Sequence, residues 1–124
     1  MKIHFYRSCE LLLGFIFLAA GVNGYIVLAG HSPLFPVSPS AMDFLANSYL
    51  LGLVKTTELI CGALFLLHRY IPLALLITAP VIVNILAFHL FVDPQLLPLA
   101  LLLFILEIIL IWKYREHFKG LLVA

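Results

Sequence analysis

Residues 71–92 read IPLALLITAPVIVNILAFHLFV and contain no Asp, Glu, Lys or Arg. A helix rises 1.5 Å per residue, so about 20 apolar residues are enough to cross the hydrocarbon core of a bilayer. The apolar residues are continuous and show none of the polar alternation that is typical of a transmembrane barrel strand. This stretch therefore predicts a membrane-spanning helix over residues 71–92.

Three further apolar stretches predict helices over residues 8–29, 46–68 and 96–114. The connections around residues 69–70 and 93–95 are short, which indicates two tight helical hairpins. We therefore expect an all-α integral membrane four-helix bundle that forms a single domain over residues 1–124. The remaining connection is an outer loop rich in proline, whose spacing suits an extended segment. Within it, we expect Ser40 to cap a short amphipathic helix with Met42, Phe44 and Leu45 on its apolar side.

The composition excludes several classes of protein. Hydrophobic residues make up 65% of the chain and charged residues only 10%, with a mean hydropathy of +1.18. Average soluble domains are about a quarter charged, so these side chains are too few to cover a small soluble domain. The apolar excess also excludes disorder. The net charge of +1, without a basic stripe, excludes a nucleic-acid partner.

The charges predict an orientation in the membrane. Basic residues flank the ends that the two termini share: Lys2, Arg7, Arg69, Lys113, Arg115 and Lys119. The opposite loops carry only Asp43 and Asp93. The positive-inside rule therefore predicts a multi-pass protein of the inner (plasma) membrane with both termini in the cytoplasm. The alternative, a signal peptide cleaved after Ala29, requires an unusually long apolar core that contains Asn23.

Six polar side chains fall within the predicted spans: Asn23, Lys55, Glu58, Asn84, His89 and Glu107. An ionisable side chain inside the membrane is costly and usually has a function. Counting from the outer end of its span, Lys55 lies about 12 Å deep and Glu58 about 17 Å deep, near the midplane. Asn23 and Asn84 reach the depth of Lys55, Glu107 is as deep as Glu58, and His89 is shallower. We therefore expect an intramembrane polar cluster around Lys55 and Glu58.

The spacing within the second span supports this cluster. Lys55 and Glu58 are three residues apart and can pair directly. Gly52 and Gly62 fall on the same helical face, where they would let another helix approach closely.

Two interpretations of the cluster stay open. In the first, Lys55 and Glu58 neutralise each other while Asn23 and Asn84 join helices by hydrogen bonds. In the second, the cluster forms an outward-opening pocket for a polar group, a quinone head or a proton. His89 is either an interfacial residue or a ligand. We expect Glu10 to be solvated at the inner interface and Glu107 to have a partner.

The sequence lacks the residue patterns that thiol oxidation, metal or haem binding and stand-alone catalysis require. Cys9 and Cys61 form no C-x-x-C pair and do not lie in the outer loops, so thiol oxidation is not expected. Only His89 lies near the cluster, and no spacing matches a metal site, so neither metal nor haem is predicted. No catalytic residues are predicted either. We expect no stand-alone enzyme, although the protein could be a subunit of a redox complex.

The spans also resemble a family. Residues 21–25 (GVNGY), 53–67 (LVKTTELICGALFLL), 69–72 (RYIP) and 79–89 (APVIVNILAFH) resemble the DoxX family of small four-helix bacterial membrane proteins. Relatives in that family include a membrane subunit of thiosulfate:quinone oxidoreductase. The resemblance implies an accessory subunit with quinone as a candidate cofactor and a redox protein as a candidate partner. Carried over by position, its motif residues are Lys55, Glu58, Gly62, Pro72, Pro80, Asn84 and His89.

Three functions remain as hypotheses. The leading one is an accessory or partner-binding protein of the inner membrane that holds a quinone or another small ligand at the polar cluster. The second is a small transporter or proton pathway with Glu58 and Glu107 as relay carboxylates, which would require oligomerisation for alternating access. The third is a structural scaffold, in which apolar residues could replace the Lys55–Glu58 pair without loss.

Overall fold

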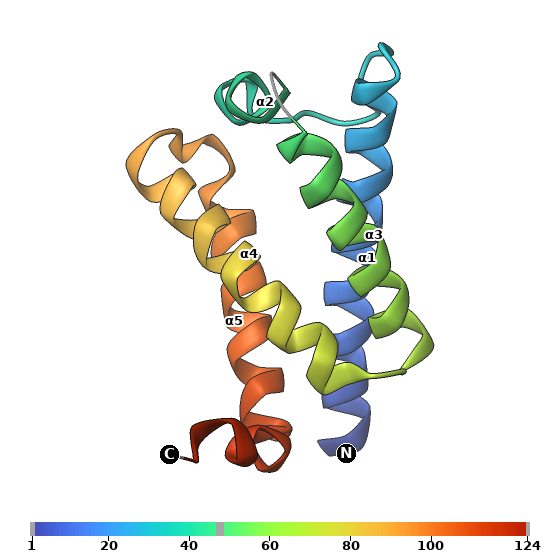
Figure 1. The fold of residues 1–124 in the computed structure, drawn as a ribbon, viewed down its shortest axis with the longest axis vertical. Helices are drawn as coiled ribbons and strands as arrows, with labels where there is room; N and C mark the ends of the chain where they lie inside the picture. Colours follow the sequence, from blue (N-terminus) through green and yellow to red (C-terminus); the bar gives the residue numbers. More distant parts are fainter. Residues whose placement is uncertain (1, 47–48, 124) are drawn as a thin grey trace.

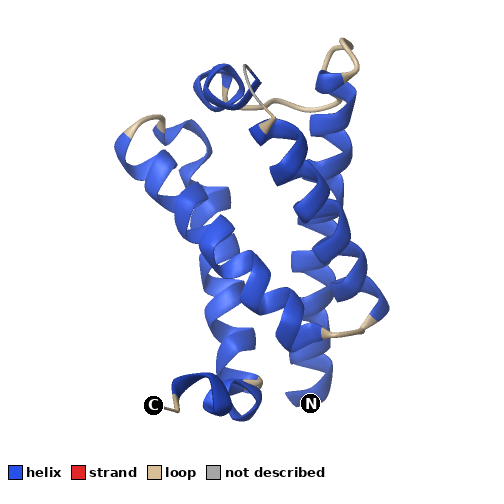
Figure 2. Cartoon of the chain, viewed as in Figure 1, coloured by secondary structure: helices blue, strands red, loops and turns tan. Residues whose placement is uncertain are grey.

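The computed structural model describes residues 2–46 and 49–123. Within these residues the chain forms five α-helices, two 3-10 helices and no strand (Figure 2). The elements, in order, are α1 (Lys2–Leu28), α2 (Pro39–Ala46), α3 (Leu50–Leu67), α4 (Ile71–Phe91), η1 (Pro94–Leu96), α5 (Leu97–Lys113) and η2 (Arg115–Leu122). The all-α prediction is confirmed.

Four segments among the described residues are long and apolar enough to cross a membrane. They are α1, α3, α4 and the continuous segment Pro94–Lys113 formed by η1 and α5, with mean hydropathies between 1.8 and 2.4. Large apolar side chains on their outer faces are exposed, as lipid-facing side chains are. A multi-pass membrane protein built from four spanning helices is therefore confirmed.

Two of the predicted helix boundaries were wrong. The first helix begins at Lys2 rather than near residue 8, because hydrogen bonds along the backbone continue through the polar residues before the apolar run. The third helix of the chain, α3, begins at Leu50 rather than at residue 46, since Ala46 ends α2 instead. Residues 47–48, which also fall in the predicted second span, lie outside the described residues.

The helices pack as two pairs (Figure 1). Helix α1 lies along α3, and α4 lies along α5. The pairs come together at the end that carries η2 and the start of α1, and they diverge toward the end that α2 covers. The buried core includes Leu13, Phe17, Phe65, Leu75 and Leu110, each at most 1% exposed. The apolar core therefore joins all four spans.

Glycines set the distance between α1 and α3. A Cβ added at Gly62 would lie 2.8 Å from the Leu18 nitrogen, and one at Gly14 would lie 2.9 Å from the Gly62 oxygen. The two backbones are thus in direct contact, as predicted for Gly62. The same prediction was wrong for Gly52, where the nearest atom to an added Cβ is Leu28 Cδ1 at 4.0 Å.

The cap of α2 differs from the expectation. Ser38 Oγ, rather than Ser40, accepts a hydrogen bond from the Ala41 N–H at 3.3 Å. Pro39 is the first residue of α2, and proline suits that position because its missing N–H has no helical partner there. The cap therefore falls one residue before Pro39, and Ser40 is exposed.

Candidate functional site

A cavity of about 1030 Å³ lies between the two helix pairs. Side chains from α1, α2, α3, α4, α5 and the outer loop line it, and its surface is largely apolar. Small-molecule sites range from about 300 to 1,000 Å³ and combine apolar walls with a few polar groups. The polar residues on this lining are Asn23, Ser38, Ser40, Lys55, Glu58, Asn84 and His89.

The Lys55–Glu58 ion pair lies on the α3 wall of the cavity. Lys55 Nζ donates a hydrogen bond to Glu58 Oε2 at 3.0 Å, and the two side chains are only 11% and 4% exposed. The direct pairing predicted from their spacing is confirmed. Gly24 makes room for the pair, because a Cβ added there would lie 2.4 Å from Cγ and Cδ of Lys55. The aliphatic part of Lys55 therefore rests on the backbone of α1.

The side chain of Asn23 forms hydrogen bonds with the proline-rich loop between α1 and α2. Its side-chain nitrogen donates to the Phe35 oxygen at 3.1 Å, and its oxygen accepts from the Leu34 N–H at 2.6 Å. Asn23 lines the cavity beside Lys55, but its hydrogen bonds hold the loop and not the ion pair. The side chain that was expected to join helices or to bind a ligand thus anchors the loop between α1 and α2.

Asn84 and His89 lie on the α4 wall, opposite the ion pair. Asn84 is exposed to the cavity and makes no side-chain hydrogen bond within the described part of the chain. His89 is 8% exposed, and its Nδ1 lies 2.7 Å from the Ile85 oxygen. Its Nε2 is buried without a hydrogen-bond partner among the described residues. The α4 wall therefore carries polar groups with unused hydrogen-bonding capacity.

Glu107 does not join the cavity. Thr78 Oγ1 lies 3.0 and 3.1 Å from the two Glu107 oxygens, and both residues are buried between α4 and α5. The expectation that Glu107 has a partner is confirmed, although the partner is a hydroxyl and not a charge. Equal depth in the membrane did not predict a shared site, because the helices place Glu58 and Glu107 on different faces.

A contact between α2 and the α4–α5 hairpin joins the two sides of the cavity at the end that α2 covers. Ser38 Oγ donates to Asp93 Oδ2 at 2.5 Å, and the Gln95 N–H donates to Asp93 Oδ1 at 3.2 Å. The hydrogen bond from Ser38, and after it the one from the Gln95 N–H, hold the pKa of Asp93 below its usual range. The same serine thus caps α2 and ties that helix across the cavity.

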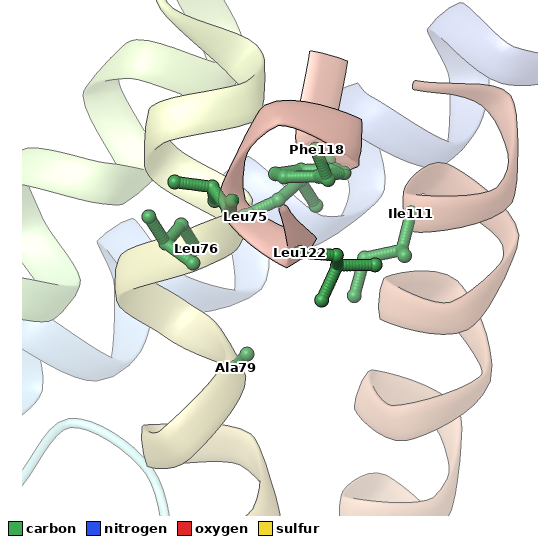
Figure 3. Close-up of a pocket in the computed structure, with 7 residues that line it drawn as sticks. Leu75, Leu76, Ala79, Ile111, Phe118 and Leu122 are labelled. Atoms are coloured by element: carbon green, nitrogen blue, oxygen red, sulfur yellow. The ribbon is translucent and has the colours of Figure 1, made fainter. Parts of the chain in front are cut away.

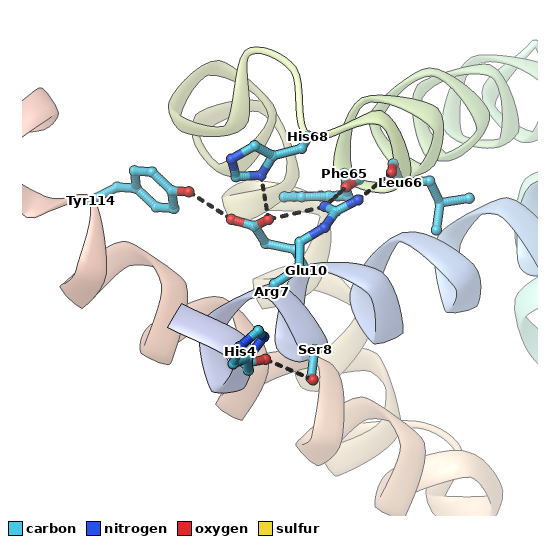
Figure 4. A network of polar contacts seen from close by, with 8 residues as sticks. All are labelled: His4, Arg7, Ser8, Glu10, Phe65, Leu66, His68 and Tyr114. Carbon is cyan, nitrogen blue, oxygen red and sulfur yellow. Dashed lines mark hydrogen bonds and ion pairs between the residues drawn. The ribbon is translucent and has the colours of Figure 1, made fainter. Parts of the chain in front are cut away.

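A second polar cluster, missed by sequence reasoning, lies toward the end of the bundle that was predicted to be the inner one (Figure 4). Glu10 is 0% exposed, so the expectation that it is solvated was wrong. Tyr114 donates to Glu10 Oε1 at 2.6 Å, while His68 Nδ1 at 2.6 Å and Arg7 at 3.1 Å contact Oε2. We call Arg7, Glu10, His68 and Tyr114 the inner cluster.

The inner cluster joins three helices. Arg7 also donates to the Phe65 and Leu66 oxygens at 2.8 and 2.6 Å, and so satisfies carbonyls at the end of α3. Burial raises the pKa of Tyr114, and the Glu10 carboxylate that accepts its hydrogen bond raises it further. The spacing of Arg7 and Glu10 was the available signal, since it repeats that of Lys55 and Glu58.

A smaller cavity of about 300 Å³ lies between α4, α5 and η2 (Figure 3). Its lining consists of Leu75, Leu76, Ala79, Ile111, Phe118, Leu121 and Leu122. None of these side chains carries a polar group that could orient a ligand. The larger cavity is therefore the candidate functional site.

Metal chemistry has no obvious ligand set in the described part of the chain. No group of three or more His, Cys, Asp or Glu residues there is arranged to hold a metal ion. Cys9 and Cys61 are buried and unpaired.

No protein-family model, characterised protein or solved structure matches this chain. The function is therefore argued from the cavity.

Proposed function

We propose that this protein is an accessory or partner-binding subunit of the inner membrane that binds an amphipathic small molecule, such as a quinone, in the larger cavity. The observation that carries the proposal is the Lys55–Glu58 ion pair on the wall of an apolar cavity of about 1030 Å³. The apolar walls suit the body of such a ligand, and the polar groups suit its head.

The position of the ion pair favours binding over a purely structural role. Apolar residues of similar volume can usually replace a buried ion pair without loss of stability, so stability alone does not explain the pair. Lys55 and Glu58 are largely buried, yet both belong to the lining of the cavity. A head group in the cavity can therefore reach both.

The resemblance to the DoxX family supports the same site. Among its motif residues, the members that line the cavity are Lys55, Glu58, Pro80, Asn84 and His89. Gly62 serves the contact between α1 and α3, and Pro72 lies in the first turn of α4. Most of the resemblance thus falls on the cavity.

We also propose that both termini face the cytoplasm. The start of α1 and the C-terminal η2 lie at the same end of the bundle (Figure 1), where the basic residues gather. With this orientation the cavity lies in the outer half of the membrane, covered by α2.

The proton-pathway alternative has less support. It needs Glu58 and Glu107 on one route, whereas Glu58 lines the cavity and Glu107 is bound by Thr78 away from its lining. Proton flux into liposomes that contain only this protein would favour that alternative.

The test is to purify the full chain from bacterial membranes in mild detergent and to identify co-purifying lipids and proteins by mass spectrometry. The wild type is compared with Lys55→Met/Glu58→Leu and with a control, Thr57→Val. Thr57 lies on the same helix, and among the described residues its hydroxyl donates a hydrogen bond to the Leu53 oxygen alone. We expect a quinone in the wild type and the control and its loss from the double variant. If no quinone co-purifies and added decylubiquinone shows no saturable binding, the proposal is wrong.

A further inference from the structure

We propose that the ligand of the larger cavity presents a hydroxyl group, so that the reduced hydroquinone binds more tightly than the quinone. This inference rests on the function proposed above and concerns the chemical class of the head group. Its basis is that two hydrogen-bond acceptors on opposite walls of the cavity have no donor among the described residues.

The first acceptor is Nε2 of His89. Its Nδ1 lies 2.7 Å from the Ile85 carbonyl oxygen, which can only accept a hydrogen bond, so Nδ1 carries the proton. In the neutral ring Nε2 is then left with a lone pair. That atom is buried and unpartnered. Asp93 cannot satisfy this lone pair, because its carboxylate accepts hydrogen bonds, here from Ser38 and Gln95, and has no hydrogen to donate.

The second acceptor is Glu58 on the α3 wall. Oε2 of Glu58 accepts from Lys55, whereas Oε1 receives no hydrogen bond within the described part of the chain. Lys55 carries three N–H donors and uses one of them on Glu58. A hydroxyl group matches this pair, because its oxygen accepts from Lys55 while its hydrogen is donated to Glu58.

A ligand that carries only carbonyl oxygens matches the site less well. A quinone oxygen can accept from Lys55 or from the Asn84 amide, but it cannot donate to Glu58 or to His89. A buried acceptor without a donor destabilises a complex, typically by about tenfold or more in affinity. Asn84 does not discriminate, since an amide both donates and accepts. The preference for a hydroxyl therefore comes from Glu58 and His89.

The wall beside His89 also suits an aromatic ring. Phe88 lines the cavity next to His89, and the two rings meet edge to face with their centroids 5.5 Å apart. Aromatic pairs of this geometry are favourable beyond the area that they bury. A ring that carries a hydroxyl group would thus find both an aromatic surface and an acceptor.

The test measures equilibrium binding to the full chain in nanodiscs by isothermal titration calorimetry. Three probes of similar shape are used: duroquinol kept reduced, duroquinone and duroquinol dimethyl ether. We expect duroquinol to bind at least about tenfold more tightly than the other two probes, since neither of them can donate a hydrogen bond.

Variants separate this inference from the proposed function. His89→Phe removes the acceptor and retains an aromatic ring. It should therefore weaken duroquinol binding and reduce the ratio of the affinity for duroquinol to that for duroquinone. Asn84→Ala should weaken the binding of both probes by a similar factor, and Thr57→Val should leave both affinities unchanged. Size-exclusion profiles and helical circular dichroism confirm folding, and His89→Leu replaces His89→Phe if the latter misfolds. Equal affinities for duroquinol and duroquinone overturn this inference alone, whereas absence of binding by any probe overturns the proposed function as well.

Discussion

At the scale of single residues, Lys55 and Glu58 depend on each other. Both are buried on α3, and within the described residues neither forms a salt bridge with any other residue. Removing one partner would leave the other charged in apolar surroundings, which typically destabilises a protein by about 3–5 kcal/mol. Replacing both by apolar residues leaves no charge without a partner, so this cost does not arise.

We therefore expect Lys55→Met to lower the free energy of unfolding by about 3–5 kcal/mol. Lys55→Met/Glu58→Leu should be as stable as the wild type or more so, although it loses the ligand. Thermal unfolding in mild detergent, followed by circular dichroism, measures both effects. A double variant as unstable as the single one would mean that the pair stabilises the bundle through contacts other than its own.

Tyr114 offers a second test at this scale, at the inner cluster. Burial and the Glu10 carboxylate hold its pKa above the ordinary value of about 10. Because the folded state favours the protonated phenol, this contribution to stability is complete below about pH 10 and is lost as the pH rises through the raised pKa. We expect the ultraviolet difference between the wild type and Tyr114→Phe to show no ionisation near pH 10.

Glu10→Gln is the matched variant for that titration. It removes the negative charge and leaves a side chain of the same shape, so the pKa of Tyr114 should move down toward its ordinary value. An unchanged titration of Tyr114 in Glu10→Gln would show that burial alone sets its pKa.

At the scale of elements, Ser38 carries two contacts that Ser40 does not. It caps α2 and donates to Asp93. We expect Ser38→Ala to speed hydrogen exchange in α2, since the loss of a serine cap alone typically destabilises a helix by about 1 kcal/mol. Ser40→Ala, at an exposed position, is the control and should have no effect. Equal exchange in the two variants would contradict the assignment of the cap.

The Ser38–Asp93 contact also predicts a pH dependence. The pKa of Asp93 is lowered, so its contribution is complete above the ordinary aspartate value of about 4. It is lost as the pH falls through the lowered pKa. Exchange in α2 should therefore accelerate only in that acidic range, and Ser38→Ala should remove most of the dependence.

The contact between α1 and α3 is a further test at this scale. A Cβ at Gly62 would meet the backbone of Leu18 at 2.8 Å, and overpacking of this kind typically destabilises a protein by about 1–3 kcal/mol. We expect Gly62→Ala to lower the thermal midpoint clearly. Gly52→Ala on the same helix has room for the added methyl group and should not. If both variants unfold like the wild type, the two backbones are not in contact.

At the scale of the whole molecule, the bundle differs between its two ends. The inner cluster joins α1, α3 and α5 at one end, and the large cavity separates the helix pairs toward the other. The proposed orientation puts η2 in the cytoplasm and α2 outside.

This orientation predicts the labelling of single cysteines in intact cells. With Cys9 and Cys61 replaced by alanine, a membrane-impermeant maleimide should label Ser40→Cys from outside. It should label Gly120→Cys only after the cells are permeabilised. Both positions are exposed, and an added Cβ at Gly120 meets no atom within 4 Å. The reverse pattern would invert the proposed topology.

Much of the fold followed from the sequence because its cause is local. A run such as residues 71–92 must satisfy its backbone hydrogen bonds internally in lipid, so a spanning helix is the only solution that it offers. The ion pair of Lys55 and Glu58 is also local, since the two residues are one helical turn apart. The close approach of another helix at Gly62 was predicted in the same way, because Gly62 lies on the helical face that carries Lys55 and Glu58.

Depth along a helix is readable from the sequence, but the direction of each side chain relative to the other helices is not. Glu58 and Glu107 were predicted to lie at about the same depth, yet of the two only Glu58 lines the cavity. Glu10 was predicted to be solvated near the interface, but it is buried and contacts His68 and Tyr114, which come from segments distant in the chain. Asn23 turned out to hold the outer loop.

The sequence by itself therefore determined that this protein is a bundle of four membrane-spanning helices with a polar pair on one of them. Only the tertiary structure decided which polar residues share a cavity and which are bound elsewhere. The physical reason is that hydropathy and helical periodicity act within one helix. The cavity, the inner cluster and the loop anchor depend instead on how side chains of separate helices meet.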